Sequence, residues 1–102
     1  MTLDLVYKDV KPTDELVKRL ESKLTKLERI INQPPPVRFT LEKMRGSYHC
    51  VARFAHRGHV FVAEGIGEDL FTASDEAVHR LEVQVTNDRK KRQGKHREAT
   101  AA

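Results

Sequence analysis

Cationic side chains recur at helical spacing along residues 14–31. Arg19, Lys23 and Lys26 are separated by four and three residues, so they share one flank of a helix, and Arg29 lies further round on its outer face. Most acidic residues of this segment fall on the other flank. Several cations at this spacing can bind nucleic-acid phosphates. The alternative is a surface whose basic side chains only cover the edge of a core.

A second group of cations lies near the C-terminus. Residues 89–102 carry a formal charge of +5 and residues 1–88 a charge of −1, within a total of +4. The densest part contains Arg89, Lys90, Lys91 and Arg92. Arg80 lies on a second predicted helix, where positive charges cluster only weakly on one flank. Such segments bind polyanions, nucleic acid before acidic membrane surfaces, and a solvated tail that aids solubility is the alternative.

Other residues that carry chemistry form weak patterns. His49, Cys50, His56 and His59 contain zinc-ligand atoms, but the first two point to opposite faces of a strand, so no metal site is predicted. The run Gly65-Ile66-Gly67 lacks the remaining residues of a phosphate loop. No nucleophile elbow or base-orienting spacing is present. We therefore predict neither an enzyme nor a cofactor, and we expect Cys50 to be a small core residue.

Length and composition restrict the architecture that positions these residues. With 102 residues, 38% of them apolar and 33% charged, the chain can form one small domain. Its apolar runs are far shorter than the roughly 20 residues of a membrane-spanning helix. The N-terminus has no signal-peptide pattern, so we expect a cytoplasmic protein without a membrane partner.

Periodicity predicts six elements. Alternating apolar residues predict strands over residues 3–8, 37–42, 48–54 and 59–64. A helix is predicted to begin after Thr13 as N-cap and to end near Asn32, before three prolines. A second helical pattern runs from about Asp69 to Val85, after Gly65 and Gly67 end the last strand. Charged residues beyond Val85 extend this pattern and are expected to fray.

This order predicts an α+β domain of the type β-α-β-β-β-α. The helical connection favours parallel pairing of the first two strands, and the short turns favour antiparallel pairing of the others. Each helix has a single apolar stripe. We therefore predict a four-stranded mixed sheet with both helices packed on one face.

Two segments resemble the bacterial ribosome hibernation factors, namely the short hibernation promoting factor and the ribosome-associated inhibitor. The similarity rests on Lys23-Leu24-Thr25-Lys26-Leu27-Glu28-Arg29, on Glu68-Asp69-Leu70-Phe71-Thr72-Ala73 and on Leu41-Glu42-Lys43. It covers residues 1–92. It implies one ribosome-binding domain over 1–92, which leaves 93–102 as a flexible basic tail.

The resemblance implies binding to small-subunit ribosomal RNA in the decoding region, with occlusion of messenger and transfer RNA. Translation would then be inhibited in stationary phase or stress. The implied RNA contacts are Lys23, Lys26, Arg29 and Arg80. Arg19 lies on the same flank of the first helix as Lys23 and Lys26. Family members often carry basic residues where this chain has Val83 and Asn87, and the cations from Arg89 to Arg92 would compensate.

Further partners follow from the same resemblance. Long family members add a C-terminal dimerisation domain that this chain does not contain, so it resembles a short form. Short forms cooperate with a separate ribosome modulation factor to pair ribosomes. The tail is not acidic, which favours the promoting type over the inhibitor type. We expect a monomer off the ribosome.

Two alternatives remain open. The order of strands and helices is similar to that of a double-stranded-RNA-binding module, but the last helix of such a module begins with lysines, and this one begins at Glu68 and Asp69. A protein-binding regulator of transcription is the other alternative. The sequence offers no obvious aromatic anchor for such an interface.

Overall fold

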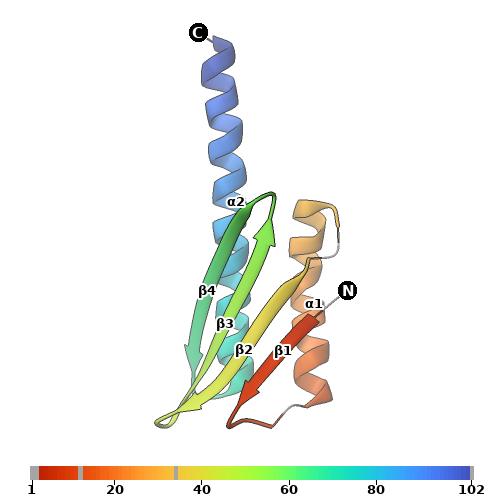
Figure 1. The fold of residues 1–102 in the computed structure, drawn as a ribbon, viewed down its shortest axis with the longest axis vertical. Helices are drawn as coiled ribbons and strands as arrows, with labels where there is room; N and C mark the ends of the chain where they lie inside the picture. The colour runs from red at the N-terminus through yellow and green to blue at the C-terminus, as the bar shows by residue number, and fades with distance from the viewer. Residues whose placement is uncertain (1–2, 12, 34, 102) are drawn as a thin grey trace.

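The computed structural model describes residues 3–11, 13–33 and 35–101, with side chains up to residue 88 and at Lys90. It contains six elements in the predicted order (Figure 1). These are β1 (Leu3–Lys8), α1 (Asp14–Ile31), β2 (Val37–Met44), β3 (Ser47–His56), β4 (His59–Gly67) and α2 (Leu70–Ala101). The predicted α+β class is confirmed.

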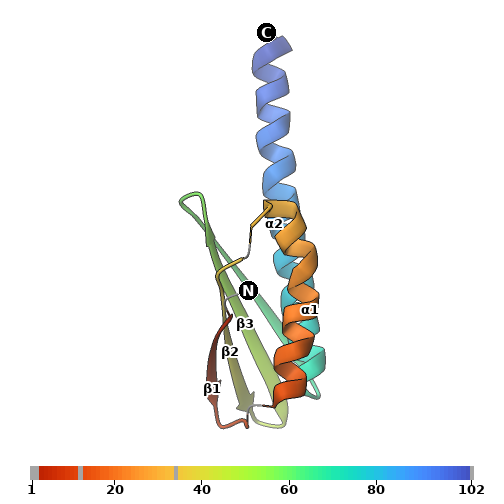
Figure 2. The ribbon, with the colours of Figure 1, turned by 90° about the vertical axis from the view of Figure 1, so that its right-hand side faces the viewer.

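The four strands form one sheet in the order β1-β2-β3-β4. β1 and β2 are parallel, and the other neighbours are antiparallel, as predicted. The register aligns Leu5 with Phe39, Phe39 with Ala52, and Ala52 with Ala63, so one row of apolar side chains crosses the sheet. Both helices cover the face that carries this row (Figure 2). No helix of the described part of the chain covers the other face.

The limits of α1 follow from its sequence. Thr13 is the N-cap, and its hydroxyl oxygen accepts a hydrogen bond from the Leu16 amide at 3.2 Å. Asn32 ends the helix in the left-handed conformation, with φ of 60°. Between these caps, one stripe of leucines is buried: Leu16, Leu20, Leu24 and Leu27. Both predicted ends are confirmed.

Cys50 lies in the core beneath these helices, as predicted. Its side chain is fully buried. Burial raises the pKa of its thiol to about 11, although a contact with Ser74 acts in the opposite direction. The thiol is therefore protonated at neutral pH.

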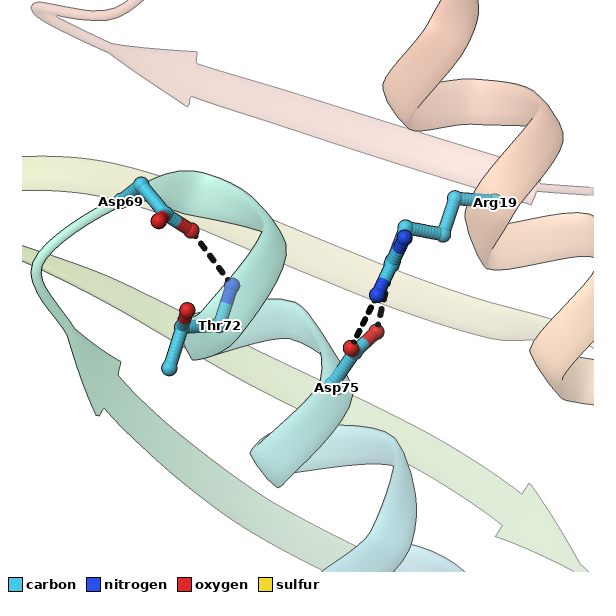
Figure 3. Close-up of polar contacts among 4 residues, drawn as sticks. All are labelled: Arg19, Asp69, Thr72 and Asp75. Carbon is cyan, nitrogen blue, oxygen red and sulfur yellow. Dashed lines mark hydrogen bonds and ion pairs between the residues drawn. The ribbon is translucent and has the colours of Figure 1, made fainter.

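α2 begins with a side-chain cap and continues past the core. The Asp69 carboxylate accepts a hydrogen bond from the Thr72 amide at 2.7 Å, which lowers the pKa of Asp69 (Figure 3). Val85 is the last buried residue among those of α2 whose side chains are described, and the helix runs on to Ala101. Among the described residues, no helix is long and apolar enough to cross a membrane.

Gly65 lies within β4, whereas the sequence predicted that the strand would end there. The strand continues to Gly67 because it stays paired with β3, with Gly65 opposite Cys50 and Gly67 opposite Tyr48. Gly65 also faces α2 at very close range. A Cβ atom at Gly65 would approach the Ala73 carbonyl oxygen to 2.0 Å and the Ala77 amide nitrogen to 2.7 Å. The glycine and the two alanines therefore let the backbones of α2 and β4 pack closely.

Gly65→Ala should destabilise the fold strongly. Overpacking typically costs about 1–3 kcal/mol, and we expect the upper end of this range because the opposing atoms are backbone. Gly58→Ala is the control, since its Cβ would meet nothing within 4 Å and only the left-handed backbone strain of about 1 kcal/mol remains. Urea unfolding of both variants measures the difference. Equal losses would contradict the close packing.

Candidate nucleic-acid interface

The basic flank of α1 lies beside α2. Two of its cations contact carboxylates there: Arg19 pairs with Asp75, and Lys26 Nζ lies 3.9 Å from Glu82 Oε2. The acidic flank of α2 therefore faces the basic flank of α1. The surface is not a simple row of free cations.

Arg19 and Asp75 form the tightest contact between the helices. Arg19 Nε and Nη2 donate hydrogen bonds of 3.1 and 2.6 Å to the two carboxylate oxygens of Asp75 (Figure 3). The Arg19 guanidinium also lies 5.4 Å from the centre of the Phe71 ring. This pairing raises the pKa of Arg19 and lowers that of Asp75. Arg19 thus holds α1 against α2, besides being a predicted RNA contact.

A groove continues from this contact along the outer side of the two helices. Its volume is about 290 Å³. Its walls are formed by Lys26 of α1 and by one face of α2: His79, Glu82, Val83, Thr86, Asn87 and Lys90. The Lys26 side chain is 74% exposed, whereas that of Glu82 is only 13% exposed. Lysine head groups therefore stand at the rim of the groove and a carboxylate at its base.

Burial and neighbouring positive charges act on Glu82 in opposite directions. Burial raises the pKa of its carboxyl group, and the positive charges of Lys26, His79 and Lys23 partly offset this shift. Lys23 also lowers the pKa of Asp75. Lys23 therefore lies within electrostatic reach of both acidic residues, and its side chain is exposed.

Arg29 extends the basic surface to the end of α1. It is exposed and lines a shallow recess with Thr25, Glu28, Asn32 and Gln33. On α2, Lys90 is exposed and lines the groove. Arg89, Lys91 and Arg92 lie in the helical backbone of α2, and their side chains are outside the described part of the chain.

Arg80 lies apart from these residues. It donates a hydrogen bond of 3.1 Å to the Glu64 carbonyl oxygen, and it forms an ion pair of 2.9 Å with Glu76. Gln84, one turn later, donates to the Val62 carbonyl oxygen at 2.9 Å. These side chains cover the outer edge of β4. The structure therefore does not bring Arg80 to the basic flank of α1.

Comparison with known proteins supports a ribosomal role for this geometry. Residues 3–93 match the family described as "Sigma 54 modulation protein / S30EA ribosomal protein". The chain belongs to this family. The sequence-based assignment to the ribosome hibernation factors is thereby confirmed. A search of curated protein sequences finds no match.

Solved structures of other proteins share the fold of this S30EA family member. The N-terminal domain of Protein Y from Thermus thermophilus superposes with a TM-score of 0.75 at 26% identity, covering 85% of this chain and 98% of that one. A ribosomal subunit interface protein from Coxiella burnetii gives a TM-score of 0.79 at 17% identity, covering 88% and 99%. The second likeness, at this identity, concerns the fold alone.

Sequence reasoning found the basic flank of this family member but not the groove. The residues that it overlooked are the polar groups of α2 that line the groove, above all Glu82, His79 and Thr86. They recur three or four residues apart, which places them on one helix face. This spacing was visible in the sequence. What it did not show is that this face turns towards α1.

The Arg19–Asp75 pair should make stability depend on acidic pH. Because the pKa of Asp75 is lowered in the folded state, its contribution is present above the unfolded pKa of about 3.9 and is lost as pH falls through the folded pKa. Asp75→Asn should therefore flatten the fall in the free energy of unfolding below about pH 4. Urea unfolding at several pH values measures this.

Arg19→Gln provides the matched background. Asp75→Asn should change the pH dependence much less when Arg19, the main cause of the shift, is absent. An unchanged effect of Asp75→Asn in both backgrounds would contradict the assigned role of the pair.

Proposed function

We propose that the protein binds small-subunit ribosomal RNA in the decoding region and blocks the passage of messenger and transfer RNA. Translation would be inhibited in stationary phase or stress, in the cytoplasm. The ribosome-binding domain spans residues 1–92, and residues 93–102 serve as a flexible basic tail. Family membership and the two structural relatives, one of them titled a ribosomal subunit interface protein, support this proposal.

The observation that carries the proposal is the groove between α1 and α2. Lys26 and Lys90 stand at its rim, and Lys23 and Arg29 extend the same surface along α1. Rigid helices hold these cations at fixed separations, which suits a phosphate backbone. Shape and charge, rather than base identity, would then select the site.

Internal carboxylates should moderate this binding. Lys26 lies near Glu82, so an incoming phosphate competes with a carboxylate for the same ammonium group. When a phosphate replaces the Glu82 carboxylate beside Lys26, the gain in binding free energy is smaller than for a phosphate that meets an unpaired cation. We infer binding that is strong at low salt and easily reversed.

Ribosome pairing through a separate ribosome modulation factor belongs to the same proposal. The protein itself would act as a monomer off the ribosome. The alternative of a double-stranded-RNA-binding module gains no support, because the first turn of α2 has an aspartate cap. A protein-binding regulator of transcription is the explanation that remains if the chain does not bind ribosomal subunits.

Reversing the charge of Lys23 and Lys26 should abolish ribosome binding. The full chain should co-sediment with purified small ribosomal subunits, saturably and more weakly as salt rises. Lys23→Glu/Lys26→Glu should remove this binding, because two phosphate contacts become repulsive. The control is Lys8→Glu/Arg53→Glu, which changes the net charge equally on exposed residues of the strands.

Two results would contradict the proposal. If both double variants weaken binding equally, net charge rather than the α1 flank governs it. If the full chain does not bind subunits even at low salt, the hibernation function fails, and a protein partner becomes the leading explanation.

Removing the competing carboxylate should strengthen binding. Glu82→Gln frees Lys26 for phosphate, and we expect subunit affinity at low salt to rise roughly two- to fivefold, the range of a surface ion pair. Glu21→Gln is the matched control, because it removes the same charge from an exposed position of α1. Weaker binding by Glu82→Gln, or an equal gain in both variants, would contradict the idea that Glu82 competes with phosphate for Lys26.

A further inference from the structure

A recess lies at one end of the core, beyond the groove. Its volume is about 210 Å³. Its lining comes from three parts of the fold: the end of α1, the β3–β4 turn and the middle of α2. The lining residues are Ile30, Ile31, Asn32, His56, Arg57, Phe61, Val85 and Asp88.

The recess exists because the elements end at different heights. α1 stops at Ile31, where Asn32 turns the chain away, whereas α2 runs on past this level. The β3–β4 turn reverses at Arg57 and Gly58, both with positive φ, of 52° and 76°. The apolar layer between the two helices and the hairpin is therefore left open at this end.

The walls of the recess are apolar and aromatic. Ile30, Ile31 and Val85 contribute aliphatic surface from the two helices. On the hairpin, the His56 ring stacks on Phe54, with ring centres 5.5 Å apart, and Phe54 stacks on Phe61 at 5.9 Å. Two aromatic rings, His56 and Phe61, thus line the recess, and each is nearly parallel to the buried Phe54 ring, at 14° and 20°. Aromatic walls of this kind suit a flat ring system.

The rim carries polar groups of both signs. Arg57 carries donors, and the Asn32 side chain carries both donors and an acceptor. A phosphate would be disfavoured beside the Asp88 carboxylate, and a purely apolar ligand would not use these polar groups. A planar ring that has donors and acceptors along its edge satisfies the walls and the rim together.

The size of the recess agrees with a single ring system. A cavity of about 150 Å³ holds benzene, and drug-sized ligands need about 300 Å³ or more. At about 210 Å³ the recess lies between these limits. RNA-binding proteins commonly stack single unpaired bases on aromatic, histidine or arginine side chains and bind their edges with polar groups.

We propose that this recess binds one unpaired nucleobase of the RNA that lies along the α1–α2 groove. Ile30 follows Lys26 by one turn of α1, and Asp88 follows Asn87, a wall residue of the groove. The recess and the groove are therefore neighbours along both helices, and a chain whose phosphates occupy the groove would come close to the recess. This inference rests on the proposed function. It adds the recognition of one base to RNA binding that otherwise depends on shape and charge.

The first test probes the recess without a ribosome. Amide resonances of the isotope-labelled full chain are followed by NMR during titration with GMP and UMP, up to millimolar concentrations. We expect saturable shifts at Asn32, Gly58 and Phe61. Ribose 5-phosphate, which has the phosphate but no base, should shift only residues of the basic flank.

Two variants close the recess or remove its stacking surface. Ile31→Phe fills the space, and His56→Ala removes a ring, so either should abolish the shifts at the recess. Ile66→Phe is the matched control, because it makes the same substitution at an exposed position of β4. Thermal unfolding verifies that each variant is folded.

The second test measures subunit affinity at several salt concentrations. Ile31→Phe and His56→Ala should each weaken binding about tenfold, as removal of one stacked base does. The salt slope should stay that of the parent, since the phosphate contacts remain. Ile66→Phe should bind like the parent.

Each other outcome overturns the inference in a recognisable way. Equal shifts with nucleotides and ribose 5-phosphate would mean that the recess binds no base. Nucleotide shifts combined with unchanged subunit affinity would assign the recess to a free nucleotide. Weaker subunit binding by the variants without nucleotide shifts would point to a protein side chain. If the parent does not bind subunits, the proposed function fails, and so does an RNA base as occupant.

Discussion

The close approach of α2 to β4 determines where the rest of the structure lies. Gly65 leaves no Cβ between the strand and the backbone of Ala73 and Ala77. α2 therefore lies directly along the last strand, where Arg80 and Gln84 donate to the outer carbonyl groups. The remaining part of the face is left to α1, so the two helices lie side by side and form a groove.

The helix pair sets cations and carboxylates against each other. Arg19 is held by Asp75, whereas Lys26 only approaches Glu82 at 3.9 Å and stays exposed. The surface thus combines one fixed contact that holds the helices together with cations that remain accessible to a ligand. Such an arrangement suits the reversible binding of RNA that we propose.

The sequence predicted the elements well because local signals specify them. Thr13, Asn32 and the alternating strand residues act within a few positions, and the predicted ends of α1 are confirmed. The continuation of β4 past Gly65 was missed because it depends on pairing with β3, where Gly65 lies opposite Cys50, and glycine itself gives no local strand signal. Two residues apart on a helix, Arg80 and Glu82 necessarily point to different sides of α2. The sequence did not show which side meets α1, since that depends on pairs such as Arg19 and Asp75, 56 residues apart.

The orientation of the protein on the small ribosomal subunit decides whether the basic surface of the two helices meets the RNA. Cryo-electron microscopy of the complex would show which surface meets the RNA. We expect ribosomal RNA phosphates along the α1–α2 groove, beside Lys23 and Lys26. The helix-free face of the sheet should then point away from the RNA. RNA against the exposed Val60 and Val62 of that face, with the groove open to solvent, would contradict it.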